Sequence, residues 1–190
     1  MNVVIGTPVH RQGAYVLDKF LANQQQIQRN YPSSEMVLAT NESDFIEELE
    51  GLLGSWGLRG EVVLYETTKP EYARSRLWNI GCGREAIRNY VLSRTDARYL
   101  LFLDADMTFD PSVVNIMERE IQNHDAVFSG YPMRRYGIGL AGCGCVTLTR
   151  SILEKLRFRC YESKNGEVIT EDNMLEMDLF RSGGRIKKGF

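Results

Sequence analysis

Short apolar runs alternate with longer segments of helical periodicity along this chain. Six runs have the length and composition of buried strands, and they span residues 3–5, 36–39, 61–65, 99–103, 126–130 and 146–148. Between and after them, apolar residues recur at helical spacing in segments 13–30, 45–53, 73–91, 111–121, 151–156 and 171–181. Strands that alternate with amphipathic helices predict the α/β class, with a mostly parallel central sheet and helices on both faces.

Polar clusters directly follow three of the predicted strands. They are Thr7–Pro8, Asn41–Glu42 and the pair Asp104 and Asp106. Because parallel sheets bind ligands outside the carboxyl ends of their strands, we expect these side chains to border one site. The sequence contains no internal repeat, low-complexity segment or linker, so we expect a single domain over residues 1–190.

Composition and charge exclude several classes of protein. The 190 residues are 43% hydrophobic and 25% charged, which is ordinary for a globular protein and unlike a disordered, collagenous or coiled-coil chain. The net charge is −2, from 23 basic and 25 acidic residues, and no basic block stands out, so we expect no nucleic-acid partner. The longest notable apolar run, 99–103, is far too short for an integral membrane segment.

The cysteines indicate the compartment. Cys82, Cys143, Cys145 and Cys160 form no Cys-x-x-Cys knuckle of the kind that holds zinc. We interpret them as reduced thiols of a cytoplasmic protein. The chain opens with a strand-like run, so we also expect no signal peptide.

Asp104 and Asp106 are the strongest chemical signal. Carboxylates at positions i and i+2, leaving a buried strand, point to the same side, and unpaired they would repel each other. A divalent cation relieves that conflict, and hard oxygen ligands suit Mg²⁺ or Mn²⁺. The pair therefore predicts a metal site whose open coordination positions a diphosphate can fill, although Asp also favours plain turns.

A second acidic pair, Glu171 and Asp172, starts the last predicted helix with Thr170 as its N-cap. Acidic residues there interact favourably with the helix dipole. A carboxylate in this place can also act as a general base toward a hydroxyl group. The chain has only two histidines, so a carboxylate base is the more probable catalytic group.

Glycines around Cys143 form a third signal. Gly142 and Gly144 let a ligand or another segment approach the backbone closely, and we expect a glycine-rich loop over 137–144. The preceding segment places Arg134 and Arg135 between Tyr131 and Tyr136. These side chains could clamp phosphate or stack on a sugar, or simply form an exposed loop.

Together these residues resemble the GT-A fold glycosyltransferases, in particular the inverting glycosyltransferase family 2. The resemblance runs from Val3 to about Gly184. The matching segments are Val3–Pro8 as the first nucleotide-binding strand, Asn41 after the second strand, Asn79 in the long helix, Leu101–Asp106 as the DxD metal motif, and Thr170–Asn173 as the Glu-Asp base motif. Family members use an aspartate of the metal motif to hold the cation that bridges the donor diphosphate.

The resemblance implies a role for each matching residue. Asp104 and Asp106 would hold Mn²⁺ or Mg²⁺, and Asp172, with Glu171 beside it, would deprotonate the acceptor hydroxyl. The donor-binding residues would be Thr7, Pro8, Asn41, Asn79, Asp104, Gly142 and Gly144. Two departures stand out: Thr40-Asn41-Glu42 stands where the family often has an acidic residue that contacts the base, and no histidine follows His124 to serve as a late metal ligand. Relatives also commonly continue with acceptor-binding elements, so we expect that region to be short or absent here.

These observations lead to one functional hypothesis and two alternatives. We expect a metal-dependent, inverting glycosyltransferase that moves a sugar from a nucleotide-diphosphate sugar to a hydroxyl of a glycan, lipid or protein acceptor. A sugar-phosphate nucleotidyltransferase shares the sheet and the acidic metal site, but residues 7–13 are a poor version of its glycine- and arginine-rich loop. The other alternative is a truncated, inactive nucleotide-sugar binding module. The oligomeric state is left open.

Overall fold

The computed structural model describes residues 3–133, 137–139 and 142–189. Within this part of the chain, a seven-stranded sheet has the order β11-β5-β8-β4-β1-β2-β3. Its strands are β1 (Val3–Pro8), β2 (Ser34–Thr40), β3 (Gly60–Leu64), β4 (Tyr99–Leu103), β5 (Ala126–Phe128), β8 (Cys145–Thr149) and β11 (Ile186–Lys188). Only β8 runs antiparallel to its neighbours, β4 and β5. The mostly parallel sheet predicted from the sequence is confirmed.

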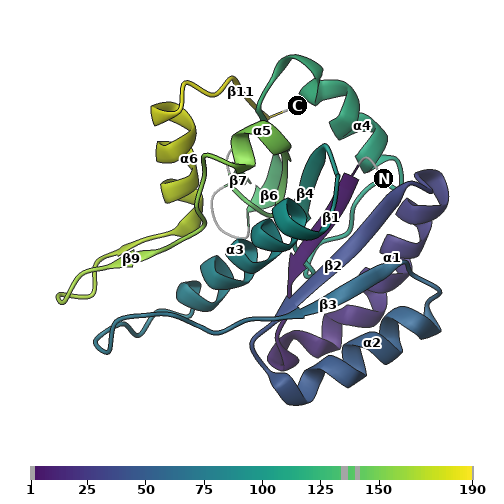
Figure 1. Ribbon diagram of the computed structural model, residues 1–190, viewed down its shortest axis with the longest axis horizontal. Coiled ribbons are helices and arrows are strands. Elements are labelled where there is room, and N and C mark those ends of the chain that lie inside the picture. Colours follow the sequence, from purple (N-terminus) through teal and green to yellow (C-terminus); the bar gives the residue numbers. More distant parts are fainter. Residues whose placement is uncertain (1–2, 134–136, 140–141, 190) are drawn as a thin grey trace.

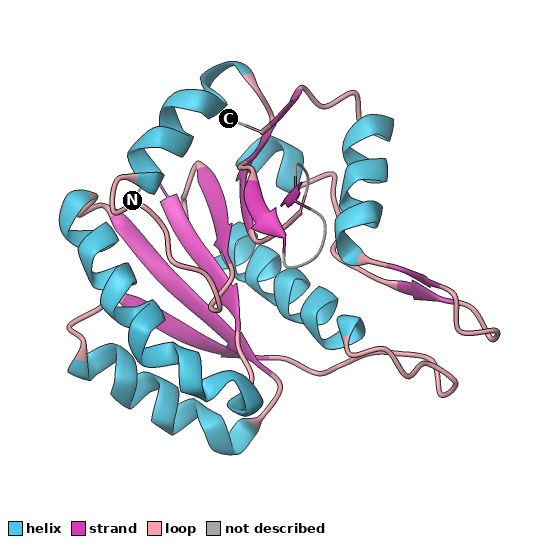
Figure 2. Cartoon of the chain, turned by 180° about the vertical axis from the view of Figure 1, so that it is seen from behind, coloured by secondary structure: helices cyan, strands magenta, loops and turns pink. Residues whose placement is uncertain are grey.

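Three helices cover each face of this sheet (Figures 1 and 2). One face packs against α1 (Leu17–Asn30), α2 (Ile46–Ser55) and α4 (Val113–Glu120). The other packs against α3 (Leu77–Arg94), α5 (Arg150–Leu153) and α6 (Glu171–Arg181). Short 3-10 helices are η1 (Arg11–Val16), η2 (Ser43–Phe45) and η3 (Ile121–Asn123). Because both faces are covered, the strands read as continuous apolar runs rather than as alternating ones.

The register of the central strands brings their carboxyl ends together. Ile5 of β1 lies opposite Met36 of β2 and Leu101 of β4. All three are wholly buried, so the apolar segments end at the same sheet edge. The polar residues that follow each strand therefore meet there, which is where ligands bind in open α/β sheets.

Two arms project from the body, as the lower left of Figure 1 shows. One arm is the irregular segment 65–76, and the other is the hairpin of β9 (Tyr161–Glu162) and β10 (Val168–Ile169). Glu162 joins them, because its carboxylate accepts hydrogen bonds from Arg74 N at 2.9 Å and Ser75 N at 3.1 Å. Trp78 Nε1, in the first turn of α3, donates to the same carboxylate at 3.1 Å.

The structure differs from the sequence prediction in four segments. The loop expected over 137–144 is partly wrong, because β6 (Tyr131–Met133) and β7 (Gly137–Gly139) pair as an antiparallel hairpin. The long helix begins at Leu77 and excludes Ala73, since the following N–H groups donate to Glu162. Neither the hairpin of β9 and β10 nor the last strand, β11, was expected.

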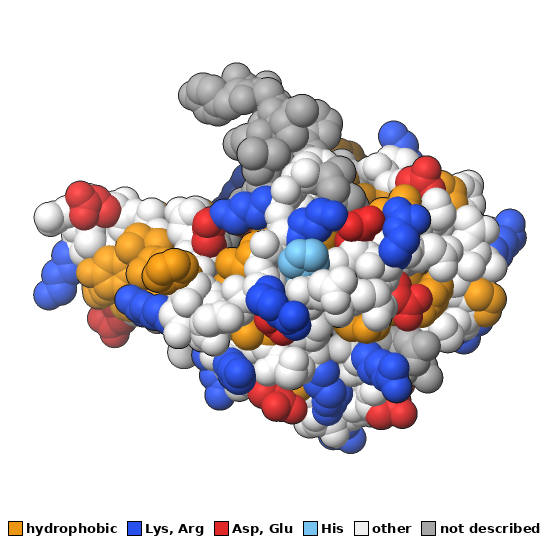
Figure 3. Space-filling view, turned by 90° about the horizontal axis from the view of Figure 1, so that it is seen from above, with side chains coloured by type: hydrophobic (Ala, Val, Ile, Leu, Met, Phe, Trp, Pro, Cys, Tyr) orange, Lys and Arg blue, Asp and Glu red, His pale blue; other side chains and the backbone are white. Residues whose placement is uncertain are grey.

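Two surface properties complete the description. Acidic and basic side chains are interspersed over the face drawn in Figure 3. Among the described residues, no helix combines the length and apolar character that a membrane crossing requires.

Candidate active site

A cleft of about 750 Å³ opens at the carboxyl ends of β1, β2 and β4, and α3 and α6 border it. Most of the residues predicted from the sequence line it. They are Pro8, Asn41, Asn79, Asp104, Asp106, Gly144, Glu171 and Asp172. These residues come from segments that lie far apart in the sequence, and the sheet register brings them to one place.

Two predicted residues do not line this cleft. Thr7 is wholly buried, and its hydroxyl donates a hydrogen bond to the Leu103 carbonyl at 2.7 Å. Thr7 therefore ties β1 to the end of β4, and its side chain is not among those that line the cleft. Gly142 is also buried and outside the lining. The predicted clamp residues Arg134, Arg135 and Tyr136 lie outside the described residues.

The acidic pair after β4 is held from two sides. The Asp104 backbone N–H donates to the Gly144 carbonyl at 3.0 Å, which fixes the end of β4 against the start of β8. Arg84 Nη2 of α3 donates to Asp104 Oδ1 at 2.7 Å. Arg84 is only 3% exposed, whereas the Asp104 side chain is 37% exposed. A buried cation thus orients a carboxylate that faces the cleft.

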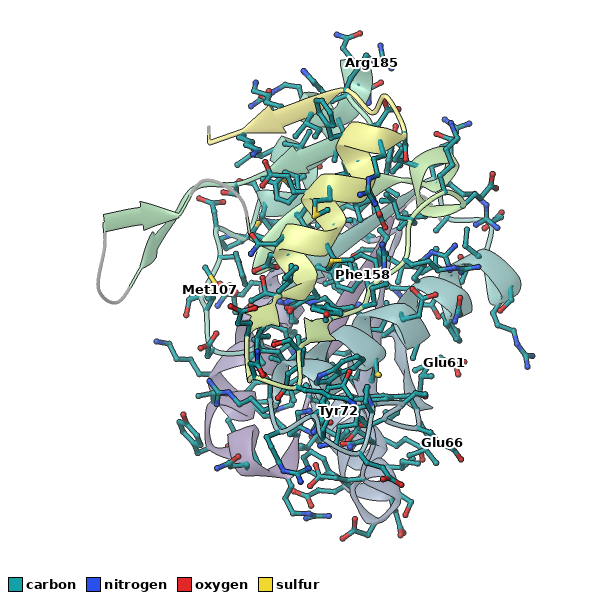
Figure 4. The ribbon with its side chains drawn as sticks, turned by 90° about the vertical axis from the view of Figure 1, so that its left-hand side faces the viewer. Glu61, Glu66, Tyr72, Met107, Phe158 and Arg185 are labelled. Carbon is teal, nitrogen blue, oxygen red and sulfur yellow. The ribbon has the colours of Figure 1, made fainter. Side chains whose placement is uncertain are left out.

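The space beside Asp104 depends on a glycine. A Cβ atom at Gly144 would lie 3.1 Å from Asp104 Oδ2 and 3.2 Å from the Met107 sulfur. Figure 4 labels Met107. The absence of a side chain at position 144 therefore keeps room around the second oxygen of Asp104. This oxygen and the Asp106 carboxylate supply the hard donors that Mg²⁺ and Mn²⁺ prefer.

The acidic pair at the start of α6 forms the opposite wall. Thr170 caps the helix, as predicted, and accepts a hydrogen bond from Asn173 N. Asp172 Oδ1 accepts a hydrogen bond from Cys143 N at 2.9 Å. Glu171 is only 4% exposed, and burial raises its pKa above the ordinary value. The two neighbours therefore differ: Asp172 is hydrogen-bonded and partly exposed, while Glu171 is a buried acid.

Polar side chains continue the cleft toward β2. Asn41 Nδ2 donates to Thr67 Oγ1 at 3.1 Å, and Thr67 Oγ1 donates to Asn79 Oδ1 at 3.0 Å. Tyr65 donates its hydroxyl hydrogen to the Asn79 carbonyl at 2.9 Å. Asn41 Oδ1 is buried and has no hydrogen-bond partner among the described residues. An acceptor atom of this kind is suited to bind a donor group of a ligand.

Two residues of this region were not among the predicted site residues. His10 lines the cleft, and its Nε2 lies 3.4 Å from the Tyr65 hydroxyl. Arg84 was overlooked although it had a signal, because it interrupts the apolar stripe of α3 between Ile80 and Ile87. An arginine within a buried helix face indicates a partner charge inside the molecule.

The cation would have to be held by few protein groups. Among the described residues, no cluster of three or more His, Cys, Asp or Glu side chains could hold a metal ion. Asp104 and Asp106 could provide two ligands, with water and a bound phosphate completing the shell, which is the usual arrangement for Mg²⁺. The donor set thus fits a cation that binds together with a phosphorylated ligand.

Comparison with solved structures identifies the fold. The chain superimposes over its full length on S. aureus TarS in complex with UDP-GlcNAc, with a TM-score of 0.65, 13% identity and 56% of that chain covered. The chain also superimposes over its full length on the mannosyltransferase PcManGT from Pyrobaculum calidifontis in complex with GDP-Man and Mn²⁺. The TM-score is 0.65, the identity is 14%, and 56% of that chain is covered. A longer TarS structure is covered over 35% of its length, with a TM-score of 0.66 and 14% identity.

The match covers only part of each solved structure. The present chain spans between about a third and three fifths of the length of these structures. The sequence itself matches no family model and no curated protein. At such low identity the likeness establishes the fold, and the GT-A fold expected from the sequence is confirmed.

Proposed function

We propose that this chain carries the donor-binding and catalytic site of a metal-dependent, inverting glycosyltransferase. One observation carries the proposal: the carboxylates of Asp104, Asp106, Glu171 and Asp172 line a single cleft at the ligand-binding edge of a GT-A sheet. Two solved structures of this fold were determined with UDP-GlcNAc and with GDP-Man and Mn²⁺. A nucleotide-diphosphate sugar is therefore the donor class that we assign to the cleft.

Asp104 and Asp106 would hold the cation, Mn²⁺ or Mg²⁺. When bound, the cation neutralises charge that grows on the departing diphosphate. The protein contributes orientation: Arg84 fixes one oxygen of Asp104, and Gly144 leaves room at the other. Pro8, Asn41 and Asn79 would contact the nucleoside, because they line the part of the cleft beside β1 and β2.

Asp172 would act as the general base in a single in-line displacement. The acceptor oxygen forms a bond to the anomeric carbon, the bond from that carbon to the diphosphate breaks, and the acceptor proton passes to Asp172. The hydrogen bond from Cys143 N to Oδ1 holds the carboxylate in place without neutralising it. Glu171 would be a neighbouring acid rather than a second base, because it is buried. Gly144 would border the sugar, and the acceptor would be a hydroxyl of a glycan, lipid or protein.

A thermal-unfolding panel tests the donor assignment. UDP-GlcNAc, GDP-Man, UDP and GDP are each tested with and without Mn²⁺, at about 100 times the dissociation constant. A ligand that binds only the folded state then stabilises it by about 2.7 kcal/mol, or roughly 5–10 °C for a chain of this size. We expect stabilisation by one nucleotide family, dependent on Mn²⁺ and lost in Asp106→Ala. No stabilisation by any of the four would contradict the proposal.

Product analysis separates the alternatives. A glycosyltransferase releases a nucleoside diphosphate and free sugar slowly even without an acceptor. A nucleotidyltransferase instead releases pyrophosphate from a nucleoside triphosphate and a sugar phosphate. A protein that binds a nucleotide sugar but releases neither product would be the inactive binding module.

A further inference from the structure

Arg84 is the buried cation of the cleft. It lies on the sheet-facing side of α3 and is 3% exposed, and its Nη2 donates to Asp104 Oδ1 at 2.7 Å. Its guanidinium carbon stands 5.4 Å from the centre of the Phe102 ring. Phe102 in turn packs edge-on against Phe158, which Figure 4 labels, with ring centres 5.1 Å apart. The aromatic floor fixes the guanidinium in place beside the carboxylate.

The remaining donors of Arg84 face a strongly acidic environment. Its Nε and Nη1 atoms are buried and have no hydrogen-bond partner among the described residues. The Asp104, Glu171 and Asp172 carboxylates all lie near enough to interact with its charge. They come from both acidic pairs, so one fixed positive charge serves the two walls of the cleft.

We propose that Arg84 prevents the cleft from binding a divalent cation tightly on its own and thereby makes cation binding depend on the diphosphate of the donor. This inference rests on the proposed function. The guanidinium already offsets the charge of Asp104, and it repels any dication that this carboxylate would ligate. A bound diphosphate adds the negative charge that restores the attraction.

The repulsion is large enough to measure. A cation bound about 2.1 Å from an Asp104 oxygen would stand roughly 6 Å from the guanidinium. Even with the dielectric constant of water, the repulsion between charges of +2 and +1 at that distance lowers the affinity of the site for the cation about tenfold. The effect is larger in a partly buried cleft, where the effective dielectric constant is lower.

The experiment is calorimetric titration with Mn²⁺ alone, Mn²⁺ with UDP, and Mn²⁺ with GDP. We expect Arg84→Met to bind Mn²⁺ alone at least about tenfold more tightly than the wild-type protein. Arg84→Lys keeps the charge and should stay within about twofold of wild type. A loss of packing or a loosened fold would weaken Mn²⁺ binding instead, so a gain in affinity identifies the charge effect.

Arg88→Met is the matched control. Arg88 lies one turn further along α3 and is also 3% exposed. Its Nε donates to the Leu153 carbonyl at 2.7 Å, and its Nη1 contacts Glu85 and Asn89. Arg88 does not line the cleft. Its replacement removes a buried arginine from the same helix, and it should leave the affinity for Mn²⁺ alone unchanged.

The outcomes distinguish this inference from the proposed function. If UDP or GDP strengthens Mn²⁺ binding in the wild-type protein but Arg84→Met binds Mn²⁺ alone no more tightly than wild type, the inference alone fails. If neither nucleotide strengthens Mn²⁺ binding in the wild-type protein, both fail. Should Arg84→Met not fold, Arg84→Gln keeps an N–H donor toward Asp104 without the charge, and the same tenfold gain is required of it.

Discussion

Replacing Asp172 with asparagine separates the basicity of this side chain from its position. The amide oxygen of asparagine can still accept the hydrogen bond that Cys143 N donates at 2.9 Å. Thr170 still caps α6 through its bond to Asn173 N. The variant therefore loses the charge and the proton-accepting carboxylate while the wall of the cleft keeps its shape.

The expected loss of catalytic rate is much larger than the expected loss of folding stability. General-base catalysis contributes about 10²- to 10⁴-fold to a rate, which corresponds to about 3–5 kcal/mol of barrier. The structural cost is much smaller, because a carboxylate in the first turn of a helix contributes about 0.3–1 kcal/mol through the helix dipole. We expect a melting temperature lowered by no more than about 4 °C.

The assay is nucleoside diphosphate release from the donor identified by the thermal panel, in the presence of an acceptor. Donor binding is measured alongside by calorimetry. Glu176→Gln serves as the control, because Glu176 lies one turn further along α6 and pairs with Lys188 at the surface. A rate within fivefold of wild type for Asp172→Asn, or a loss of donor binding as large as its loss of rate, would refute the assignment of Asp172 as base.

Two further substitutions test buried side chains, one that lines the cleft and one that lies beneath it. Burial raises the pKa of Glu171, so the folded state binds a proton more readily than the unfolded chain. Its ionisation then costs stability as pH rises above the ordinary value of 4.5. Glu171→Gln should gain stability relative to wild type toward neutral pH and lose that gain near pH 4, measured by urea unfolding; a difference independent of pH would contradict this. Thr7→Val leaves the Leu103 carbonyl without its buried partner and should cost about 1–3 kcal/mol in unfolding free energy, and an unchanged midpoint would show that the bond contributes nothing.

The central sheet and its covering helices could be predicted because the long strands are continuous apolar runs in the sequence. Val4, Leu101 and Phe102 are fully buried, and their runs end in polar residues that mark the sheet edge. Strands of two or three residues, such as β9, β10 and β11, carry too few positions to show a period. The sequence analysis missed these three strands for this reason. It also missed the pairing of β6 with β7, which are three residues long each.

Most residues of the site could be named from the sequence, but the contacts that each side chain makes could not. Asp104 and Asp106 directly follow a predicted strand, which predicted that they lie in the cleft, and both line it. That Thr7 would turn inward to Leu103, and that Arg84 would reach Asp104 from a helix, depends on side-chain packing between segments 20 and 96 residues apart. The arginine within the apolar stripe of α3 signals a buried partner charge, but the partner of neither contact has a local signature in the chain.

The hydrogen bonds of Glu162 connect the two projecting arms to each other. The first arm runs directly into α3, which carries Asn79 and Arg84, and the second runs directly into Glu171 and Asp172. Three N–H groups, from the first arm and from α3, donate to one carboxylate of the second arm. The two walls of the cleft are therefore joined outside the sheet as well as through it.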